Sequence, residues 1–324
     1  MNASVEANHG KKSYALVTSA YNEEAYIKEP LRAVVAQTLS PRKWVIVSDA
    51  STDGTDEIVR EYAKQYPYIQ LFRMPERHER SFAAQVDAIN AGYEQLRNSQ
   101  FDFIGNVDSD ISFEPDYFER LFAEFDKDPR LGMAGGTIYE KKGDTFRPRR
   151  GNQPHSVMHG VQMFRRECFD SLGGYTRLPH GSPDSHAEVS LRMRGWRVRS
   201  IPGLKAFHHR PNGMAGGYIW YSYREGLADF SLGAHPLFEL AKTLRRIPGR
   251  YYGLCALAML TGFIHAYLRG DKRVTSDEFA AYLREEQLAR LRPSAWRKGF
   301  RLQERTSSSI VTAPDVFKGL RTPK

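Results

Sequence analysis

The stretch Phe101–Asp110, FDFIGNVDSD, joins an apolar run to two carboxylates that stand two residues apart. The run Phe101–Val107 has the length and composition of a buried strand, and Asp108 and Asp110 follow where it stops. Hard oxygen ligands of this kind are what Mg²⁺ or Mn²⁺ prefers when it bridges a diphosphate. A D-x-D pattern alone is a weak signal, because Asp is also common in turns that close strands. Its meaning depends on the motifs that the fold places beside it.

The first two-thirds of the chain alternate β-branched or aromatic runs with helix-like stretches. Strands separated by helices predict an α/β fold with a mostly parallel sheet, whose ligand site lies beyond the carboxyl ends of the strands. The predicted strands are Tyr14–Ser19, Lys43–Ser48, Ile69–Arg73, Phe101–Val107, Met133–Tyr139 and Arg197–Ile201. The predicted helices are Pro30–Thr38, Thr55–Gln65, Phe82–Arg97 and Glu114–Asp126.

Two further polar clusters follow predicted strands and are expected at the same edge of the sheet. Ser19–Glu24 (SAYNEE) follows the first strand, and Ser48–Thr55 (SDASTDGT) follows the second. Asp49, at the second strand tip, can accept from the imide N–H of a uracil or from ribose hydroxyls. Asp53 and Gly54 are assigned to the turn itself. Three clusters at one edge favour a nucleotide and metal site over unrelated turns.

These motifs resemble those of the family 2 glycosyltransferases, which are inverting enzymes with the GT-A fold. Ser19–Glu24 resembles the P-x-Y-N-E opening, Asp49–Thr55 resembles V-D-D-G-S-x-D-x-T, and Asp108-Ser109-Asp110 resembles the D-x-D. Gly160–Tyr175 is similar to the G-x-x-x-x-F-R-R…G-G-[FY] segment before the acceptor site. The resemblance spans about residues 13 to 210. It implies a bacterial envelope or exopolysaccharide enzyme, with a mixed, mostly parallel sheet flanked by helices.

The resemblance also implies a set of ligand-binding residues. Tyr21 would pack on the nucleotide base and Asp49 would accept from it, while Mn²⁺ or Mg²⁺ would neutralise the diphosphate. One histidine of the pair His208-His209, with His209 preferred, would complete the metal shell. The nucleotide-binding set is Ser19, Ala20, Tyr21, Glu23, Asp49, Arg80, Asp108 and Ser109, and the metal set is Asp108, Asp110 and His209.

The chain departs from the family pattern at three positions. Ala20 stands where proline is frequent, and Ser48 replaces the first Asp of the usual pair. Gln85 falls near a position often held by Lys or Arg, before the A-x-N-x-G helix at Ala88–Gly92. Arg80 is the candidate for the missing charge to the diphosphate.

A general base is expected near Gly181–Glu188 (GSPDSHAE), because inverting transfer must remove a proton from an acceptor hydroxyl. Ser182 as N-cap and Pro183 at the first helical position predict a helix whose dipole keeps Asp184 ionised. The family's base lies eleven residues before a G-[YW], which selects Asp184. Counting the position of the base from the family's L-R pair instead shifts the alignment and makes Glu188 a second candidate. Both residues therefore stay candidates, with Asp184 preferred.

Composition limits the class of protein. The chain has 324 residues, of which 41% are hydrophobic and 26% charged, so it is not disordered over most of its length. Its two cysteines, Cys168 and Cys255, do not form a disulfide framework and suggest a reducing compartment. The net charge of +9 is uneven, because residues 211–324 hold 18 Lys and Arg against 10 Asp and Glu. A basic region predicts an anionic partner.

The last third changes to a helical pattern. Tyr251–Leu268 is a mostly apolar run, borderline for a membrane span of about 20 residues. Basic residues flank it on both sides, so it lies on an anionic bilayer surface or forms a buried hairpin packed on the catalytic domain. The flanking residues are Arg245, Arg246, Arg250, Arg269, Lys272 and Arg273.

The sequence therefore predicts three parts: a flexible tail over residues 1–12, a GT-A catalytic domain over 13–215 and a basic helical region over 216–324. The expected function is transfer of a sugar from a UDP- or GDP-sugar to a hydroxyl acceptor, lipid-linked or polysaccharide. Nucleic acid is not expected as a partner, and the expected location is cytoplasmic, at the inner face of the cell membrane. The alternatives are a nucleotidyltransferase on a related fold and a nucleotide-binding scaffold without catalysis.

Overall fold

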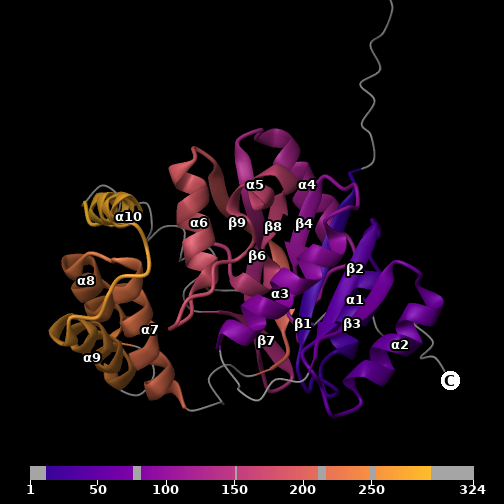
Figure 1. The fold of residues 1–324 in the computed structure, drawn as a ribbon, viewed down its shortest axis with the longest axis horizontal. Coiled ribbons are helices and arrows are strands. Elements are labelled where there is room, and N and C mark those ends of the chain that lie inside the picture. The colour runs from indigo at the N-terminus through magenta and orange to yellow at the C-terminus, as the bar shows by residue number, and fades with distance from the viewer. Residues whose placement is uncertain (1–11, 76–81, 150–151, 211–216, 249–252, 293–324) are drawn as a thin grey trace, which may run out of the picture.

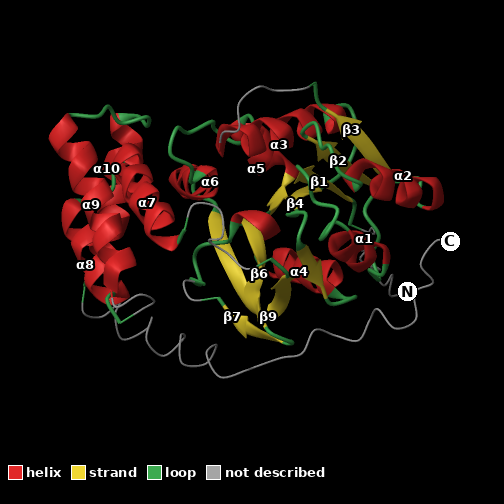
Figure 2. Cartoon of the chain, turned by 90° about the horizontal axis from the view of Figure 1, so that it is seen from below, coloured by secondary structure: helices red, strands yellow, loops and turns green. Residues whose placement is uncertain are grey.

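The computed structural model describes residues 12–75, 82–149, 152–210, 217–248 and 253–292. One nine-stranded sheet with helices on both faces makes up the part before residue 211, and four helices follow it (Figures 1 and 2). The strands are β1 (Tyr14–Ala20), β2 (Lys43–Ser48), β3 (Ile69–Arg73), β4 (Phe103–Asn106), β5 (Ile111–Phe113), β6 (Leu131–Lys142), β7 (Thr145–Pro148), β8 (Met163–Arg165) and β9 (Arg197–His208). The helices of this part are α1 (Lys28–Val35), α2 (Thr55–Gln65), α3 (Phe82–Leu96), α4 (Tyr117–Lys127), a 3₁₀ turn η1 (His159–Val161), α5 (Arg166–Leu172) and α6 (Pro183–Met193).

The sheet is mixed, as predicted. Its strand order is β3-β2-β1-β4-β8-β6-β9-β5, with β7 paired to β6. The pairs β1–β2, β1–β4, β2–β3 and β6–β9 are parallel, whereas β8 runs antiparallel to both β4 and β6. The sequence patterns did not predict the short strands β5, β7 and β8. They also predicted that β9 ends at Ile201. The strand instead continues to His208, past a register shift opposite Gly136 and Thr137.

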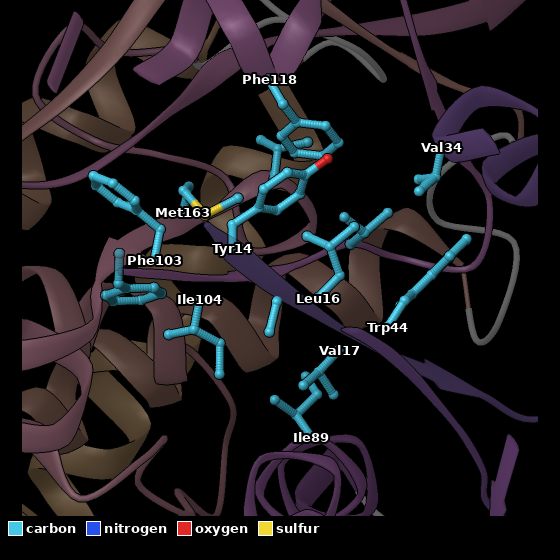
Figure 3. Packing of buried hydrophobic residues seen from close by; sticks show 14 of the residues in the cluster. Tyr14, Leu16, Val17, Val34, Trp44, Ile89, Phe103, Ile104, Phe118 and Met163 are labelled. Carbon is cyan, nitrogen blue, oxygen red and sulfur yellow. The ribbon is translucent and has the colours of Figure 1, made fainter. Parts of the chain in front are cut away.

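The central strand β1 is buried on both faces, which explains its continuous apolar run. Tyr14 and Leu16 face one side, where the Tyr14 ring lies 4.8 Å from that of Phe118 in α4 (Figure 3). Val17 faces the other side, where a Cβ on Gly92 of α3 would lie 2.6 Å from it. Helices thus cover both faces, and only the strand ends remain open to a ligand.

The helices α7 (Tyr218–Leu232), α8 (Pro236–Arg246), α9 (Leu254–Arg269) and α10 (Asp277–Arg290) form the C-terminal part. Helices α7 and α9 pack closely because glycines meet the opposite backbone: a Cβ at Gly226 would lie 1.9 Å from the Met259 carbonyl oxygen. One face of α9, including Met259 and Phe263, is therefore buried, and its opposite face is exposed. Among the described residues, no helix combines the length and apolar character needed to cross a bilayer.

Candidate active site

The carboxyl ends of β1, β2 and β4 lie side by side, and the three sequence motifs follow them. The Asp49 N–H donates to the Ala20 carbonyl oxygen at 2.8 Å, and the Val107 N–H donates to the Val17 carbonyl oxygen at 3.0 Å. Pairing between neighbouring strands thus continues to the first residues of the motif loops. The predicted convergence at one edge of the sheet is confirmed.

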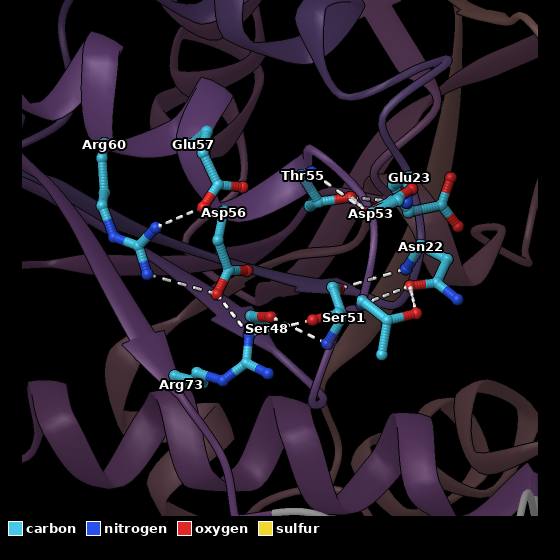
Figure 4. A network of polar contacts seen from close by, with 11 residues as sticks. Asn22, Glu23, Ser48, Ser51, Asp53, Thr55, Asp56, Glu57, Arg60 and Arg73 are labelled. Carbon is cyan, nitrogen blue, oxygen red and sulfur yellow. Dashed lines mark hydrogen bonds and ion pairs between the residues drawn. The ribbon is translucent and has the colours of Figure 1, made fainter.

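Hydrogen bonds join the first two motif loops (Figure 4). The Asn22 N–H donates to Ser51 Oγ at 3.1 Å, and Asn22 Oδ1 accepts from the Thr52 N–H at 2.8 Å. The Glu23 N–H donates to Thr55 Oγ1 at 2.8 Å. Asn22 takes a left-handed backbone conformation, with φ of 53°, that an Asn tolerates better than most residues. The asparagine of the motif therefore acts mainly to fix the two loops together.

The Asp53 carboxylate belongs to the same loop contact. It accepts from the Glu24 N–H at 3.1 Å and from the Thr55 N–H at 3.0 Å, while Glu24 Oε2 accepts from the Gly54 N–H at 3.1 Å. Slight burial raises its pKa, but the hydrogen bonds from Thr55 and Glu24 outweigh this and lower it. Asp53 and Gly54 form the turn, as the sequence predicted.

Four residues predicted to bind the nucleotide lie at this edge. Ser19 and Asp49 are half-buried at the ends of β1 and β2, Ala20 is buried, and Tyr21 is 38% exposed. Ala50, next to Asp49, has a φ of 57°, so the chain turns sharply there. Tyr21 and Asp49 thus border the open end of the sheet, and their contacts with a nucleotide stay predictions.

Asp110 lies in a cluster of charged and imidazole groups. Its Oδ2 is 3.3 Å from Arg210 Nε and 3.3 Å from His208 Nε2. Arg210 also forms an ion pair with Glu23, from the first motif. Burial raises the pKa of Glu23 to about 7, and Asp110 adds to this although Arg210 acts in the opposite direction. Arg210 thus links Glu23, which is predicted to bind the nucleotide, to Asp110 of the D-x-D motif.

Asp108 lies on the other side of the D-x-D motif, against η1. His159 Nδ1 is 3.5 Å from its Oδ1, and Gln85 Nε2 is 3.4 Å from the same oxygen. Burial alone would raise the pKa of Asp108, but His159 lowers it. Gly160 is required here, because a Cβ would lie 2.3 Å from Asp108 Oδ2. Gln85 therefore reaches the site, whereas Arg80 lies outside the described residues.

His208, rather than the preferred His209, contacts Asp110 in the structure, and a metal-binding role for either histidine stays a prediction. His209 Nε2 is instead 2.7 Å from Ser112 Oγ, and its ring lies 5.3 Å from the Phe146 ring. Burial lowers the pKa of His209 to about 4. His208, the last residue of β9, faces Asp110 instead. Successive side chains along a strand point to opposite sides, which accounts for the different contacts of the two rings.

The A-x-N-x-G helix fixes the segment before the expected acceptor site. Asn90 binds the backbone of Tyr175 twice, accepting from its N–H at 2.9 Å and donating to its carbonyl oxygen at 2.8 Å. The Tyr175 hydroxyl donates to Gln162 Oε1 at 2.5 Å, and its ring lies 5.1 Å from that of His159. Asn106 also donates to the His159 carbonyl oxygen at 2.8 Å. His159 is a site residue that the sequence did not single out; the His-Gly pair opening the acceptor segment was the available signal.

Asp184 lies in the first turn of α6, as predicted. Pro183 begins the helix, but Ser182 does not cap it with its side chain and instead takes a left-handed conformation with φ of 66°. Asp184 is half-buried and forms no hydrogen bond or ion pair with a described side chain. Its charge helps to raise the pKa of His159, against the effect of burial. Asp184 is therefore close to the D-x-D region and available to a substrate.

Glu188, the second candidate base, is already engaged. It is 4% exposed, accepts from the Val157 N–H at 2.6 Å and from Ser156 Oγ at 3.0 Å, and lies 3.5 Å from Arg192. Burial raises its pKa to about 8. These contacts hold the loop that precedes His159. Glu188 therefore helps to position this loop, and which of the two residues is the base stays a prediction.

The donors at the D-x-D motif fit a divalent cation in an open site. Carboxylates from Asp108 and Asp110 and the imidazole of His208 are suitable ligands for Mn²⁺, and His208 Nδ1 is buried without a hydrogen-bond partner. Within the described part of the chain, no group of three or more His, Cys, Asp or Glu side chains is arranged to hold a metal ion by itself. A cation held by one or two carboxylates and by substrate phosphates does not require one.

Comparison with known proteins agrees with this arrangement. The family model of glycosyl transferase family 2 matches residues 15–187. The chain belongs to this family. Two solved structures resemble the family 2 chain: mannosyltransferase PcManGT from Pyrobaculum calidifontis in complex with GDP-Man and Mn²⁺, and S. aureus TarS 1–349 in complex with UDP-GlcNAc. They have TM-scores of 0.53 and 0.51 and identities of 20% and 14%, over 90% and 84% of this chain and 84% and 78% of theirs. These similarities confirm the predicted GT-A fold.

Curated relatives match shorter stretches of the family 2 chain. EpsH of Bacillus subtilis (strain 168) is 33% identical over 107 residues, which are 33% of this chain and 28% of EpsH. The succinoglycan biosynthesis protein ExoA of Rhizobium meliloti (strain 1021) is 26% identical over 215 residues, 57% of this chain and 60% of ExoA. The chain thus covers less than two thirds of either relative.

Proposed function

We propose that this family 2 chain is a metal-dependent, inverting glycosyltransferase that moves a sugar from a nucleoside-diphosphate donor to a hydroxyl acceptor. The observation that carries the proposal is the placement of three carboxylates around one end of the sheet. Asp108 and Asp110 follow β4, and Asp184 opens α6 close enough to influence His159, which itself lies 3.5 Å from Asp108. Asp108 and Asp110 would bind on the donor side, and Asp184 would act on the acceptor.

The donor side would be formed by the D-x-D motif and the ends of β1 and β2. Asp108 and Asp110, with His208, would hold a divalent cation, which when bound neutralises charge on the leaving nucleoside diphosphate. Tyr21 and Asp49 border the same opening and would bind the base and ribose. The complexes of PcManGT with GDP-Man and Mn²⁺, and of TarS with UDP-GlcNAc, support a GDP- or UDP-sugar as the donor.

Asp184 would act as the general base. In a single displacement, the acceptor oxygen forms its bond to the anomeric carbon while the bond from that carbon to the diphosphate breaks. The hydroxyl proton passes to the Asp184 carboxylate during this step. Asp184 lies in the first turn of α6, at the positive end of the helix dipole. Inversion at the anomeric carbon follows from the single displacement.

The acceptor would be a hydroxyl of an envelope polysaccharide or of its lipid-linked precursor, at the inner face of the cell membrane. The name of ExoA, a succinoglycan biosynthesis protein, supports a polysaccharide product. The excess of Lys and Arg after residue 210 supports an anionic membrane surface as a further partner. Nucleic acid is not proposed, because the basic region shows no nucleic-acid-binding motif.

Donor hydrolysis across a panel of UDP-, GDP- and dTDP-sugars tests this function. The full chain should release one nucleoside diphosphate in the presence of Mn²⁺, and excess EDTA should abolish the release. Asp110→Asn should lose most of the activity while keeping its unfolding temperature. A nucleotidyltransferase would release pyrophosphate from a nucleoside triphosphate instead, and a scaffold would bind the nucleotide without turnover. Either result, or full activity in EDTA, would refute the proposal.

A further inference from the structure

Helix α8 packs with its polar side inward. Glu239 and Thr243 are 1% and 2% exposed on the face that meets the other helices. Lys242, on the same side, forms ion pairs with Asp229 and Glu225 of α7, the latter at 3.4 Å. Removing charges from water is costly unless they are paired, and here the pairs fix the rotation of the helix. The buried network therefore determines which side of α8 faces outward.

The outward side of α8 is apolar. Leu237, Leu240, Leu244 and Ile247 are 59%, 44%, 58% and 43% exposed. The strip continues onto α9. Ile247, at the end of α8, lies beside Gly253, since a Cβ on Gly253 would be 3.6 Å from Ile247 Cγ2. The residues that follow Gly253 include two exposed leucines. We call this surface the leucine face: Leu237, Leu240, Leu244, Ile247, Leu254 and Leu257.

Exposed apolar side chains concentrate in this part of the molecule. Of the fifteen large apolar side chains that are exposed among the described residues, all except Tyr21 lie beyond residue 216. Single exposed leucines are normal on protein surfaces, whereas a continuous apolar strip marks an interaction surface. Trp220 and Tyr221 at the start of α7 are also exposed, at 55% and 48%, but among the described residues no contact joins them to the leucine face.

Charge selects the partner of this surface. Residues 217–292 hold 11 Lys and Arg against 8 Asp and Glu, and residues 293–324 hold 7 against 2. A second copy of the chain would bring the same positive charge to the contact, whereas an anionic bilayer brings the opposite charge. Helices α8 and α9 have 11 and 16 residues, so they suit a position in the plane of the interface.

We propose that the leucine face docks on the surface of a bilayer containing anionic lipid, with α8 and α9 lying in the headgroup region. The proposal deepens the proposed function, on which it rests for the nature of the acceptor. Within the expected docking segment Tyr251–Leu268 it selects the exposed residues Leu254 and Leu257, because another side of α9, including Met259 and Phe263, is buried. Of the flanking cations, Arg246 pairs with Glu225 and Arg269 pairs with Asp271, so the leucines provide the specific contact.

The docking face is connected to the candidate base. Helix α10 contacts α6 through Arg192 and Glu286, whose ion pair measures 2.9 Å, and through the rings of His186 and Phe279, 4.9 Å apart. Figure 1 shows α7, α8 and α9 beside the sheet domain, with α6 between α10 and the sheet. A bilayer against the leucine face would therefore bind the same helical part that packs, through α10, on the helix that carries Asp184.

Vesicle flotation of the full chain tests the proposal. We expect binding to vesicles of about 70% phosphatidylcholine and 30% phosphatidylglycerol, and at least about tenfold weaker binding to pure phosphatidylcholine. The double variant Leu240→Glu/Leu244→Glu should weaken binding to the anionic vesicles by about tenfold or more, because it places charge in the apolar contact. Leu288→Glu is the matched control: Leu288 is 40% exposed on α10, outside the leucine face, and its variant should bind like the unaltered chain.

Two measurements separate this proposal from its rivals and from the proposed function. Donor hydrolysis without acceptor should be the same in the double variant and in the unaltered chain. A variant that hydrolyses the donor normally is folded, so its loss of vesicle binding does not result from misfolding. Size-exclusion chromatography should show a monomer without vesicles. A dimer that the double variant dissociates, vesicle binding that the variant leaves intact, or no vesicle binding at all would overturn the docking proposal. An inactive chain that still binds vesicles would refute only the proposed function.

Discussion

The sheet domain and the helices α7–α9 distribute polar and apolar side chains in opposite ways. In the sheet domain, β1 buries Leu16 and Val17 on its two faces, and polar side chains gather where the strands end. In α8, Glu239 and Lys242 point inward and the leucines point outward. Both parts of the molecule bury charged groups. Only the sheet domain buries them at a site that is suited to a ligand.

The difference concerns function rather than stability. A buried ion pair contributes no more to stability than well-packed apolar residues of the same volume, and often less. Outward-facing leucines add no stability in water either, because they stay hydrated. We therefore attribute the inverted arrangement of α8 to the partner proposed for its outer face. In the proposed function the sheet domain would bind small ligands at the strand ends, whereas α8 would dock on the surface of a bilayer.

The largest expected effect is on the catalytic end of the sheet domain. Asp184→Asn should lower turnover by about 10²–10⁴-fold, because Asn keeps the shape of the side chain but cannot take the acceptor proton. Nucleoside diphosphate binding should stay unchanged, since the residue serves the acceptor. Steady-state kinetics and calorimetry on the same preparations measure the two quantities.

Glu188→Gln is the matched control for that experiment. Gln can still accept from the Val157 N–H and from Ser156 Oγ, so the loop before His159 should keep its position and turnover should stay within about tenfold. Loss of turnover in Glu188→Gln with retention in Asp184→Asn would show that the base register was chosen wrongly. Retention in both would remove the basis for the inverting mechanism.

A smaller effect, on stability, sharpens the contrast between the two regions. Lys242→Met should lower the free energy of unfolding by about 3–5 kcal/mol, because it removes the cation from the buried Glu239 and from the partly buried Asp229, and leaves Glu225 with Arg246 alone. Lys127→Met in α4 removes an exposed partner of Glu124 and should cost at most about 1 kcal/mol. Urea unfolding at neutral pH provides both values.

Equal effects of the two lysine substitutions would contradict this contrast. They would mean that the charged side of α8 is hydrated in solution and that its leucines are free to turn inward. The leucine face would then lose its structural basis, whatever the vesicles bind. A large effect confined to Lys242 would instead show that the ion pairs hold α8 with its apolar side outward.

Local sequence patterns predicted the elements whose burial is continuous. β2, β3 and α2 have the predicted bounds, and β1 ends one residue later than predicted, because an apolar run or a 3.6-residue period identifies each of them. The short strands β5, β7 and β8 were missed. Three or four residues carry too little pattern, and their pairing depends on partners far along the chain, as in β4 with β8.

The site residues also divide into those that local sequence patterns predict and those whose position depends on distant partners. Local signals predicted that the D-x-D motif follows a strand and that Asp184 lies in the first turn of a helix, and both positions are confirmed, while the roles of these residues stay predictions. The pairing of Arg210 with Glu23 joins residues 187 positions apart, and the choice between His208 and His209 depends on the twist of a strand end. For α8, periodicity shows two faces, but only the partners of Lys242 determine which face is buried.

The smallest expected effect concerns His209, whose ring packs in the sheet domain without reaching Asp110. Its pKa in the folded chain is lowered to about 4 by burial, from an ordinary value of 6.5. A lowered pKa means that the folded state resists protonation, so this stabilising contribution is present above pH 6.5 and is lost as the pH falls toward 4. His209→Gln cannot titrate, and it also loses part of the contact with Ser112 at every pH.

Unfolding measurements at two pH values therefore separate the two contributions of His209. At pH 7.5 the variant should be less stable than the unaltered chain, and between pH 7.5 and pH 5 the balance should shift by about 2 kcal/mol in favour of the variant, since 1.5 pH units below 6.5 correspond to that energy. Mn²⁺-dependent nucleotide binding should stay unchanged in His209→Gln and weaken in His208→Gln, because only His208 faces Asp110. A stability difference independent of pH, combined with loss of Mn²⁺-dependent binding in His209→Gln, would show that the ring turns toward the D-x-D motif in solution and that the preference from sequence for His209 was right.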